Sequence, residues 1–166
     1  MKPIFAIDPG YTKSAYCVYH PDTHVVREFA KVDNDMLRAI ITASTVWEYE
    51  YAVEMIASYG MPVGREVFET CLWVGRYQEI IHRYNKPFEL IYRKDVKQHL
   101  CGNLKAKDSN IRQSIMDLFP ATGGGKKPVI GTKAEPGPLY GVSNDVWAAV
   151  GVALTYHNKQ KRLEAA

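Results

Sequence analysis

The chain has 166 residues, of which 46% are hydrophobic and 23% charged, so its composition is that of an ordinary soluble globular protein. This length suits one domain, residues 1–166, with a full core. No apolar stretch approaches the ~20 residues that a membrane helix needs, and Asp8, Pro9 and Gly10 interrupt any signal-peptide pattern. The three cysteines are far apart and odd in number. We therefore expect a cytoplasmic protein with reduced thiols and without a zinc site.

The net charge is only +3, but it is unevenly distributed along the sequence. Residues 83–133 contain eleven Lys or Arg and four Asp or Glu, whereas the remainder contains ten basic and fourteen acidic residues. A basic region beside an acidic one suits a polyanionic partner together with a separate metal site. A solvated charged face would give the same pattern.

The order of apolar patterns predicts a mixed α/β fold. The first 31 residues read as an antiparallel meander of three strands, near 3–8, 14–19 and 24–31. Later strands are expected at 51–56 and 88–92. Helical periodicity predicts helices over 36–44, 64–84, 93–100, 107–119 and 143–161, with Asp33 or Asn34 capping the first and Ser143 capping the last. Residues 120–142 predict a long flexible loop rich in Gly, Pro and Lys.

Three acids stand at positions that a core does not readily explain. Asp8 follows the apolar run 4–7, and Glu54 lies within the apolar run 51–56, where an unpaired carboxylate is unfavourable. Asp145 falls in the first turn of the last predicted helix. A turn cap, a salt bridge and a helix-dipole contact are the respective structural alternatives. Taken together, the three acids indicate a shared metal site.

The ordered set of motifs resembles the RuvC family of Holliday junction resolvases, within the ribonuclease H-like superfamily. The resemblance covers nearly the whole chain, and the loop at 120–140 looks more like phage-encoded members. Bacterial members carry a second acid one helical turn after the first in the last helix, where this chain has Ala148. The motifs are Ile7-Asp8-Pro9-Gly10 with Ser14, Ala52-Val53-Glu54, Asp95-Val96-Lys97, Gly102 with Lys105-Ala106-Lys107, and Asp145 followed by residues 148–155.

The resemblance implies a ribonuclease H-like sheet, with three antiparallel strands followed by parallel strands and flanked by helices. It also implies a homodimeric endonuclease that makes paired symmetric nicks in four-way DNA junctions and leaves 5′-phosphates. Asp8, Glu54 and Asp145 would hold two Mg²⁺ or Mn²⁺ ions, because carboxylates suit these hard cations. The helix at 64–84 would form the dimer contact.

Basic and aromatic residues are candidate DNA contacts. Lys107 would neutralise charge in the transition state, and Tyr59 would act as an aromatic wedge at the junction centre. A solvated helix end and a core tyrosine are the alternatives. The remaining candidates are Lys105 and Arg112 near Lys107, and Lys126, Lys127 and Lys133 in the predicted loop.

Other functions remain open from the sequence. A nuclease of the same superfamily that cuts flaps or other branched DNA would carry the same acids. Ala148 also allows a junction-binding protein without catalysis. An actin-like ATPase begins with a similar Asp-x-Gly loop, but the chain is short for two lobes and lacks a second phosphate loop.

Overall fold

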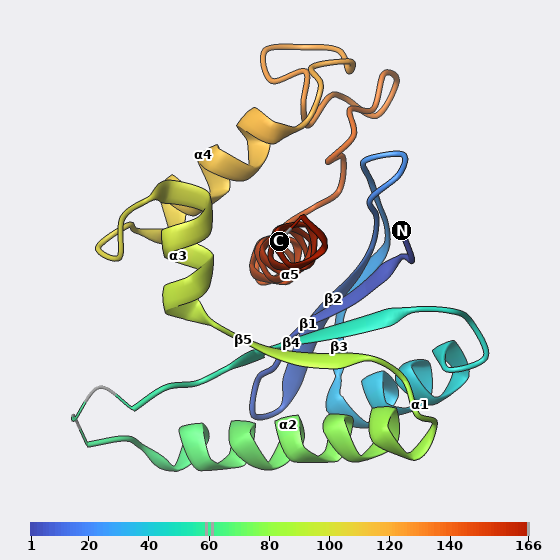
Figure 1. The fold of residues 1–166 in the computed structure, drawn as a ribbon. Coiled ribbons are helices and arrows are strands. Elements are labelled where there is room, and N and C mark those ends of the chain that lie inside the picture. Colours follow the sequence, from blue (N-terminus) through green and yellow to red (C-terminus); the bar gives the residue numbers. More distant parts are fainter. Residues whose placement is uncertain (59, 61, 166) are drawn as a thin grey trace.

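The computed structural model describes residues 1–58, 60 and 62–165. Within this part of the chain, five strands form one sheet that is flanked by five helices (Figure 1). None of the described helices has the length and apolar character needed to cross a membrane. The elements are β1 Ile4–Asp8, β2 Lys13–His20, β3 Val25–Asp33, α1 Asn34–Ser44, β4 Glu50–Met55, α2 Arg65–Arg83, β5 Phe88–Tyr92, α3 Arg93–Cys101, α4 Asp108–Leu118 and α5 Val146–Glu164.

The strand order is β3-β2-β1-β4-β5. β1, β2 and β3 pair antiparallel, whereas β4 lies parallel to both β1 and β5. The predicted mixed sheet is therefore confirmed. Because β1, β4 and β5 run in the same direction, their carboxyl ends reach the same edge of the sheet.

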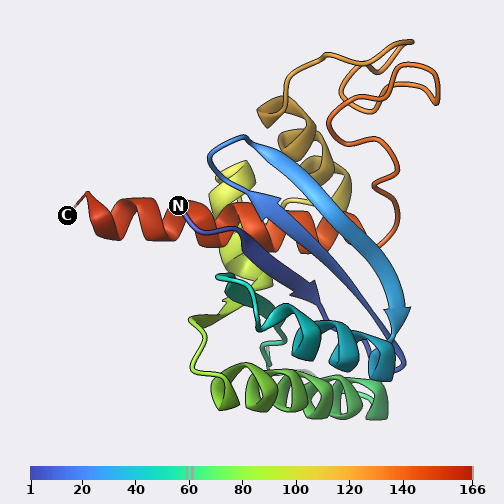
Figure 2. The same ribbon diagram turned by 90° about the vertical axis from the view of Figure 1, so that its right-hand side faces the viewer.

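Helices cover both faces of the sheet. α1 and α2 pack together on one face, while α5 crosses the other with α3 and α4 outside it (Figures 1 and 2). Side chains alternate between the faces with the two-residue period of a strand. On the α5 face lie Ile4, Ala6, Ala52 and Ile91, and on the α1–α2 face lie Phe5, Ile7, Tyr51 and Val53, all of them buried.

Two helix starts differ from the sequence prediction. α1 begins at Asn34 rather than Met36, and Asp33 precedes it without a side-chain cap. α5 begins at Val146, and Asp145 occupies its N-cap position, so the expected cap at Ser143 is wrong. Ser143 contributes only a backbone carbonyl, which accepts a hydrogen bond from the Val146 amide.

The segment 120–142 contains no helix or strand, yet it is not structureless. Its backbone folds back on itself, with hydrogen bonds from Gly123 N to Pro128 O (2.8 Å) and from Gly137 N to Ile130 O (2.9 Å). A Cβ atom on Gly137 would lie 2.3 Å from Pro128 O, so only glycine fits this crossing. Leu139 anchors the segment in the core with no exposed surface.

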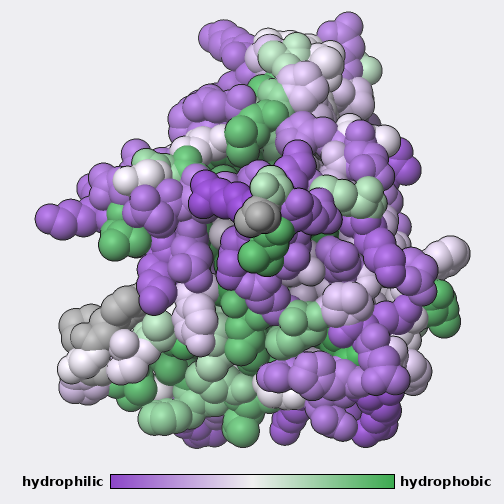
Figure 3. Space-filling model, in the orientation of Figure 1, coloured by the Kyte–Doolittle hydropathy of each residue, from purple (hydrophilic) through white to green (hydrophobic). Residues whose placement is uncertain are grey.

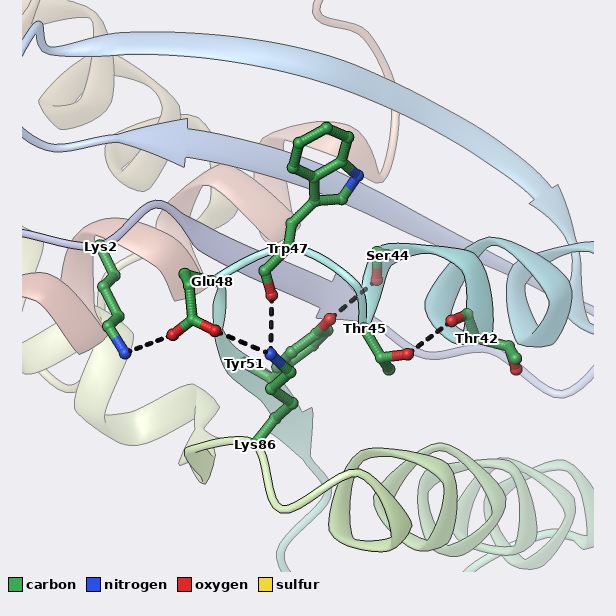
Figure 4. Close-up of polar contacts among 8 residues, drawn as sticks. All are labelled: Lys2, Thr42, Ser44, Thr45, Trp47, Glu48, Tyr51 and Lys86. Atoms are coloured by element: carbon green, nitrogen blue, oxygen red, sulfur yellow. Dashed lines mark hydrogen bonds and ion pairs between the residues drawn. The ribbon is translucent and has the colours of Figure 1, made fainter.

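A polar cluster ties together the connections at the starts of the parallel strands (Figure 4). The Lys86 ammonium donates to the Trp47 carbonyl (2.9 Å) and pairs with Glu48 (3.4 Å), whose other oxygen accepts from Lys2 (2.8 Å). These residues precede β1, β4 and β5. The cluster thus fixes the strand starts, at the edge opposite to the strand ends that carry Asp8 and Glu54.

Candidate metal and DNA site

Strand register brings Asp8 and Glu54 together. Asp8 follows Ala6 by two residues on β1, and Glu54 follows Ala52 by two residues on β4. β1 and β4 are neighbours with Ala6 opposite Ala52, so both acids continue the face that packs against α5. They line one cavity of about 170 Å³.

The turn after Asp8 is held by buried polar contacts. The Ser14 hydroxyl donates to Asn34 Oδ1 (2.7 Å), lies 3.1 Å from the Tyr77 hydroxyl and accepts from the Gly10 amide (3.1 Å). The Asn34 amide donates to the Gly10 carbonyl (2.8 Å). Ser14 and Asn34 are almost completely buried. These contacts fix the backbone conformation of the turn that follows Asp8.

The surroundings of the two carboxyl groups disfavour their charged forms. Burial and the charges of Glu54 and Asp145 together raise the pKa of Asp8 to about 8, against the lowering effect of the Arg93 charge. Burial also raises the pKa of Glu54, against the opposing effects of the Arg93 charge and the Asp8 hydrogen bond. Two charged carboxylates at this place are therefore unfavourable without a proton or a cation between them.

Asp145 lies at the N-terminus of α5 and pairs with Lys31 of β3. Lys31 is opposite Ala15, which is opposite Asp8, so the three positions form one row across the sheet. The charge of Asp145 acts on Asp8. Within the described residues, however, no three acid, His or Cys side chains lie close enough together to hold one metal ion as they stand.

Arg93 is a site residue that we did not predict. It follows buried Ile91 by two residues, so the strand period that aligns Asp8 and Glu54 could have identified it. Its guanidinium lies 3.7 Å from Glu54 and forms an ion pair with Asp108. Arg93 lines both the Asp8–Glu54 cavity and a second cavity of about 110 Å³ that contains Asp145.

The predicted DNA contacts lie in separate places. Arg112 lines the Asp145 cavity, and its guanidinium stacks 4.6 Å from the Trp147 ring. Lys105 and Lys107 line a different hollow between α3 and α4. The loop lysines Lys126, Lys127 and Lys133 are exposed. Tyr59 lies outside the described residues.

The donor set fits a hard divalent cation. The described residues that line the two cavities supply carboxylate oxygens from Asp8, Glu54, Asp108 and Asp145, and none of them is His or Cys. Burial and the nearby charges of Glu54 and Asp145 raise the pKa of Asp8, and a bound cation would relieve that repulsion. Ala148 lines the Asp145 cavity and adds no ligand.

Comparisons with known proteins identify the fold. No protein-family model matches the sequence, and no curated protein matches it. The structure is similar to Thermus thermophilus RuvC in complex with a Holliday junction substrate, with a TM-score of 0.67 and 16% identity over 95% of this chain and 93% of that one. A second Thermus thermophilus RuvC structure gives a TM-score of 0.65 and 16% identity over 96% of both chains. The predicted ribonuclease H-like α/β fold is confirmed, in the form found in RuvC.

Proposed function

We propose that this protein is a Holliday junction resolvase, a metal-dependent endonuclease that nicks four-way DNA junctions in symmetric pairs and leaves 5′-phosphates. One observation carries the proposal. Two mostly buried carboxyl groups from adjacent strand ends, Asp8 and Glu54, line one cavity in a fold that is similar to RuvC over nearly the whole chain. Such paired acids are unfavourable in a core and suit a divalent-metal site.

Asp8, Glu54 and Asp145 would hold Mg²⁺ or Mn²⁺, with two ions in each site. Bound there, the ions would activate a water and stabilise the leaving oxygen of the phosphodiester. The chain itself positions these ligands through the β1–β4 register and the turn contacts of Ser14. Asp145 must exchange its ion pair with Lys31 for the cation. Lys31 would then be available to the DNA backbone.

The exposed lysines Lys105, Lys107, Lys126, Lys127 and Lys133, together with Arg112 and Tyr59, remain proposed DNA contacts. A protein that neutralises several phosphates binds DNA less tightly as salt concentration rises. In this proposal the protein acts in the cytoplasm of a bacterium or of a phage-infected cell.

The proposed assembly is a homodimer, because two symmetric cuts need two sites related by a two-fold axis. Apolar side chains gather over α2 on one face of the molecule (Figure 3). Phe68 and Leu72 of α2 are 62% and 63% exposed, which supports α2 as the contact. Leu72→Glu should convert the dimer to a monomer in light scattering. A wild-type protein that cuts junctions as a monomer would contradict this part.

The deciding experiment uses labelled four-way junctions with symmetric and asymmetric cores, incubated with Mg²⁺ or Mn²⁺. Cuts on all four strands are mapped. We expect paired cuts at symmetry-related positions, and Asp8→Asn should retain junction binding while cutting is lost. Cutting by this variant at the wild-type rate would refute the assignment.

A second candidate is a junction-binding protein without catalysis. The observation that favours it is Ala148, which adds no carboxylate to the Asp145 cavity. Tight junction binding with no cut by the wild-type protein in either metal would establish it. Preferential cutting of flaps over junctions would instead indicate a nuclease of the same superfamily with another branched substrate.

A further inference from the structure

Arg93 occupies the position between the two parts of the acidic site. It lines the cavity that contains Asp8 and Glu54 and also the cavity that contains Asp145. Its side chain is 27% exposed, whereas its Nη1 atom is buried. It is the cation closest to Glu54 among the ion pairs of the described residues.

One nitrogen of the Arg93 guanidinium is hydrogen-bonded, and another has no hydrogen-bond partner within the described residues. Nη2 donates to Asp108 at the start of α4. Nη1 lies 3.7 Å from Glu54, beyond hydrogen-bond distance, and has no hydrogen-bond partner within the described part of the chain. A buried donor without a partner is unfavourable, so an acceptor that reaches it would be bound strongly.

A phosphodiester is the acceptor that this arrangement suits. A guanidinium presents planar, forked donors that match phosphate oxygens. A divalent cation on Asp8 and Glu54 would neutralise Glu54 and remove the charge that Arg93 now faces. Lys107, the cation expected from the sequence, lines another hollow with Lys105.

We propose that Arg93, anchored by Asp108, binds a non-bridging oxygen of the phosphate at the cut position. This inference rests on the proposed function, since it takes the DNA strand to pass over Asp8 and Glu54. Arg93 is then the residue that places the phosphate, and Asp108 is a positioning residue that keeps the guanidinium between the cavities.

The test measures junction affinity in Ca²⁺, so that binding is read without depending on cutting. A series of junctions carries one neutral methylphosphonate at successive positions around the exchange point. For the wild-type protein we expect one position at which the substitution weakens binding about tenfold, comparable to the loss of a charge-assisted contact. With Arg93→Ala the same substitution should change affinity less than twofold. Arg93→Lys should give an intermediate loss.

Controls separate the phosphate contact from a structural role. Arg27→Ala removes an exposed arginine of β3 and should behave as wild type. Mn²⁺ binding to the DNA-free protein, followed by electron paramagnetic resonance, should be unchanged or tighter in Arg93→Ala, because a competing positive charge is removed. Asp108→Ala should lower the methylphosphonate effect, because Arg93 loses its anchor. If Arg93→Ala does not fold, Arg93→Gln replaces it.

Three results would overturn the inference. The first is that the methylphosphonate weakens binding by Arg93→Ala as much as binding by the wild type. The second is that this weakening disappears in Lys107→Ala but not in Arg93→Ala. The third is that Arg93→Ala no longer binds Mn²⁺. Failure of the proposed function has a different signature. The wild-type protein would then cut no junction in Mg²⁺ or Mn²⁺, while the position-dependent binding effect and its loss in Arg93→Ala would still test the phosphate contact.

Discussion

Replacement of the buried Asp8 carboxyl by an amide should stabilise the folded protein at neutral pH. The pKa of Asp8 is about 8 in the folded chain, against an ordinary value of 3.8. Between these values the folded state binds more protons than the unfolded state, so the free energy of unfolding falls as pH rises. The decrease in the free energy of unfolding is complete above pH 8 and absent below pH 4. Asp8→Asn removes the titrating group and with it this dependence.

The size of the effect follows from the shift. One pKa unit corresponds to about 1.4 kcal/mol, so the four-unit shift sets a ceiling of about 6 kcal/mol on the destabilisation. We expect Asp8→Asn to recover about 2 kcal/mol at pH 7.5, because Glu54 remains buried and charged beside Arg93. For a chain of this size, that corresponds to a rise in Tm of about 4–8 °C.

The assay is urea unfolding in EDTA at pH 5, 6, 7 and 8, followed by circular dichroism. The difference between variant and wild type should grow with pH and be small at pH 5. The matched control is Asp117→Asn, an exposed acid on α4, for which no growth with pH is expected. A stability difference independent of pH, or a less stable Asp8→Asn at pH 8, would refute the reasoning from the raised pKa of Asp8.

Three other predictions concern the turn, the loop and DNA binding. Ser14→Ala leaves buried partners of its hydroxyl unpaired and should lower the free energy of unfolding by about 1–3 kcal/mol in urea titrations, a result that wild-type stability would contradict. Gly137→Ala should destabilise by about 1–3 kcal/mol through a backbone clash, whereas Gly75→Ala, with open space around it in α2, should stabilise by about 0.5–1 kcal/mol. Equal effects of the two alanines would be inconsistent with the loop geometry. Lys126→Ala and Lys133→Ala should each reduce the slope of log affinity against log salt by about 1 in junction-binding titrations, and an unchanged slope would exclude a phosphate contact.

Much of the fold could be predicted from sequence because its signals are local. The apolar runs of β1 and β4 predict these strands and place Asp8 and Glu54 at or near their ends. The predicted first residues of the helices were less accurate than the predicted strands. Asn34 is buried and binds the Gly10 carbonyl, a tertiary contact that no local pattern of residues 33–36 reveals.

Part of the candidate site was also predictable from local sequence signals. The acids were found because a carboxylate in an apolar context is unusual. Arg93 and Lys31 were missed because their positions near the site depend on pairing with Glu54 and Asp145, which belong to other elements. The assignment of Lys107 to the transition state relied on motif order alone. In the folded chain, α4 places it beside Lys105 in a hollow apart from the acids.

The folded-back segment 120–142 is shaped by contacts between main-chain atoms at its glycines, and its lysines project outward from that frame. Its outer side chains are therefore replaceable without altering the path of the chain. A library randomised at positions 126, 127 and 133 would change how tightly the protein binds nucleic acid, while the backbone fold of the segment stays the same. This makes the segment a natural place to engineer which branched molecules the protein selects.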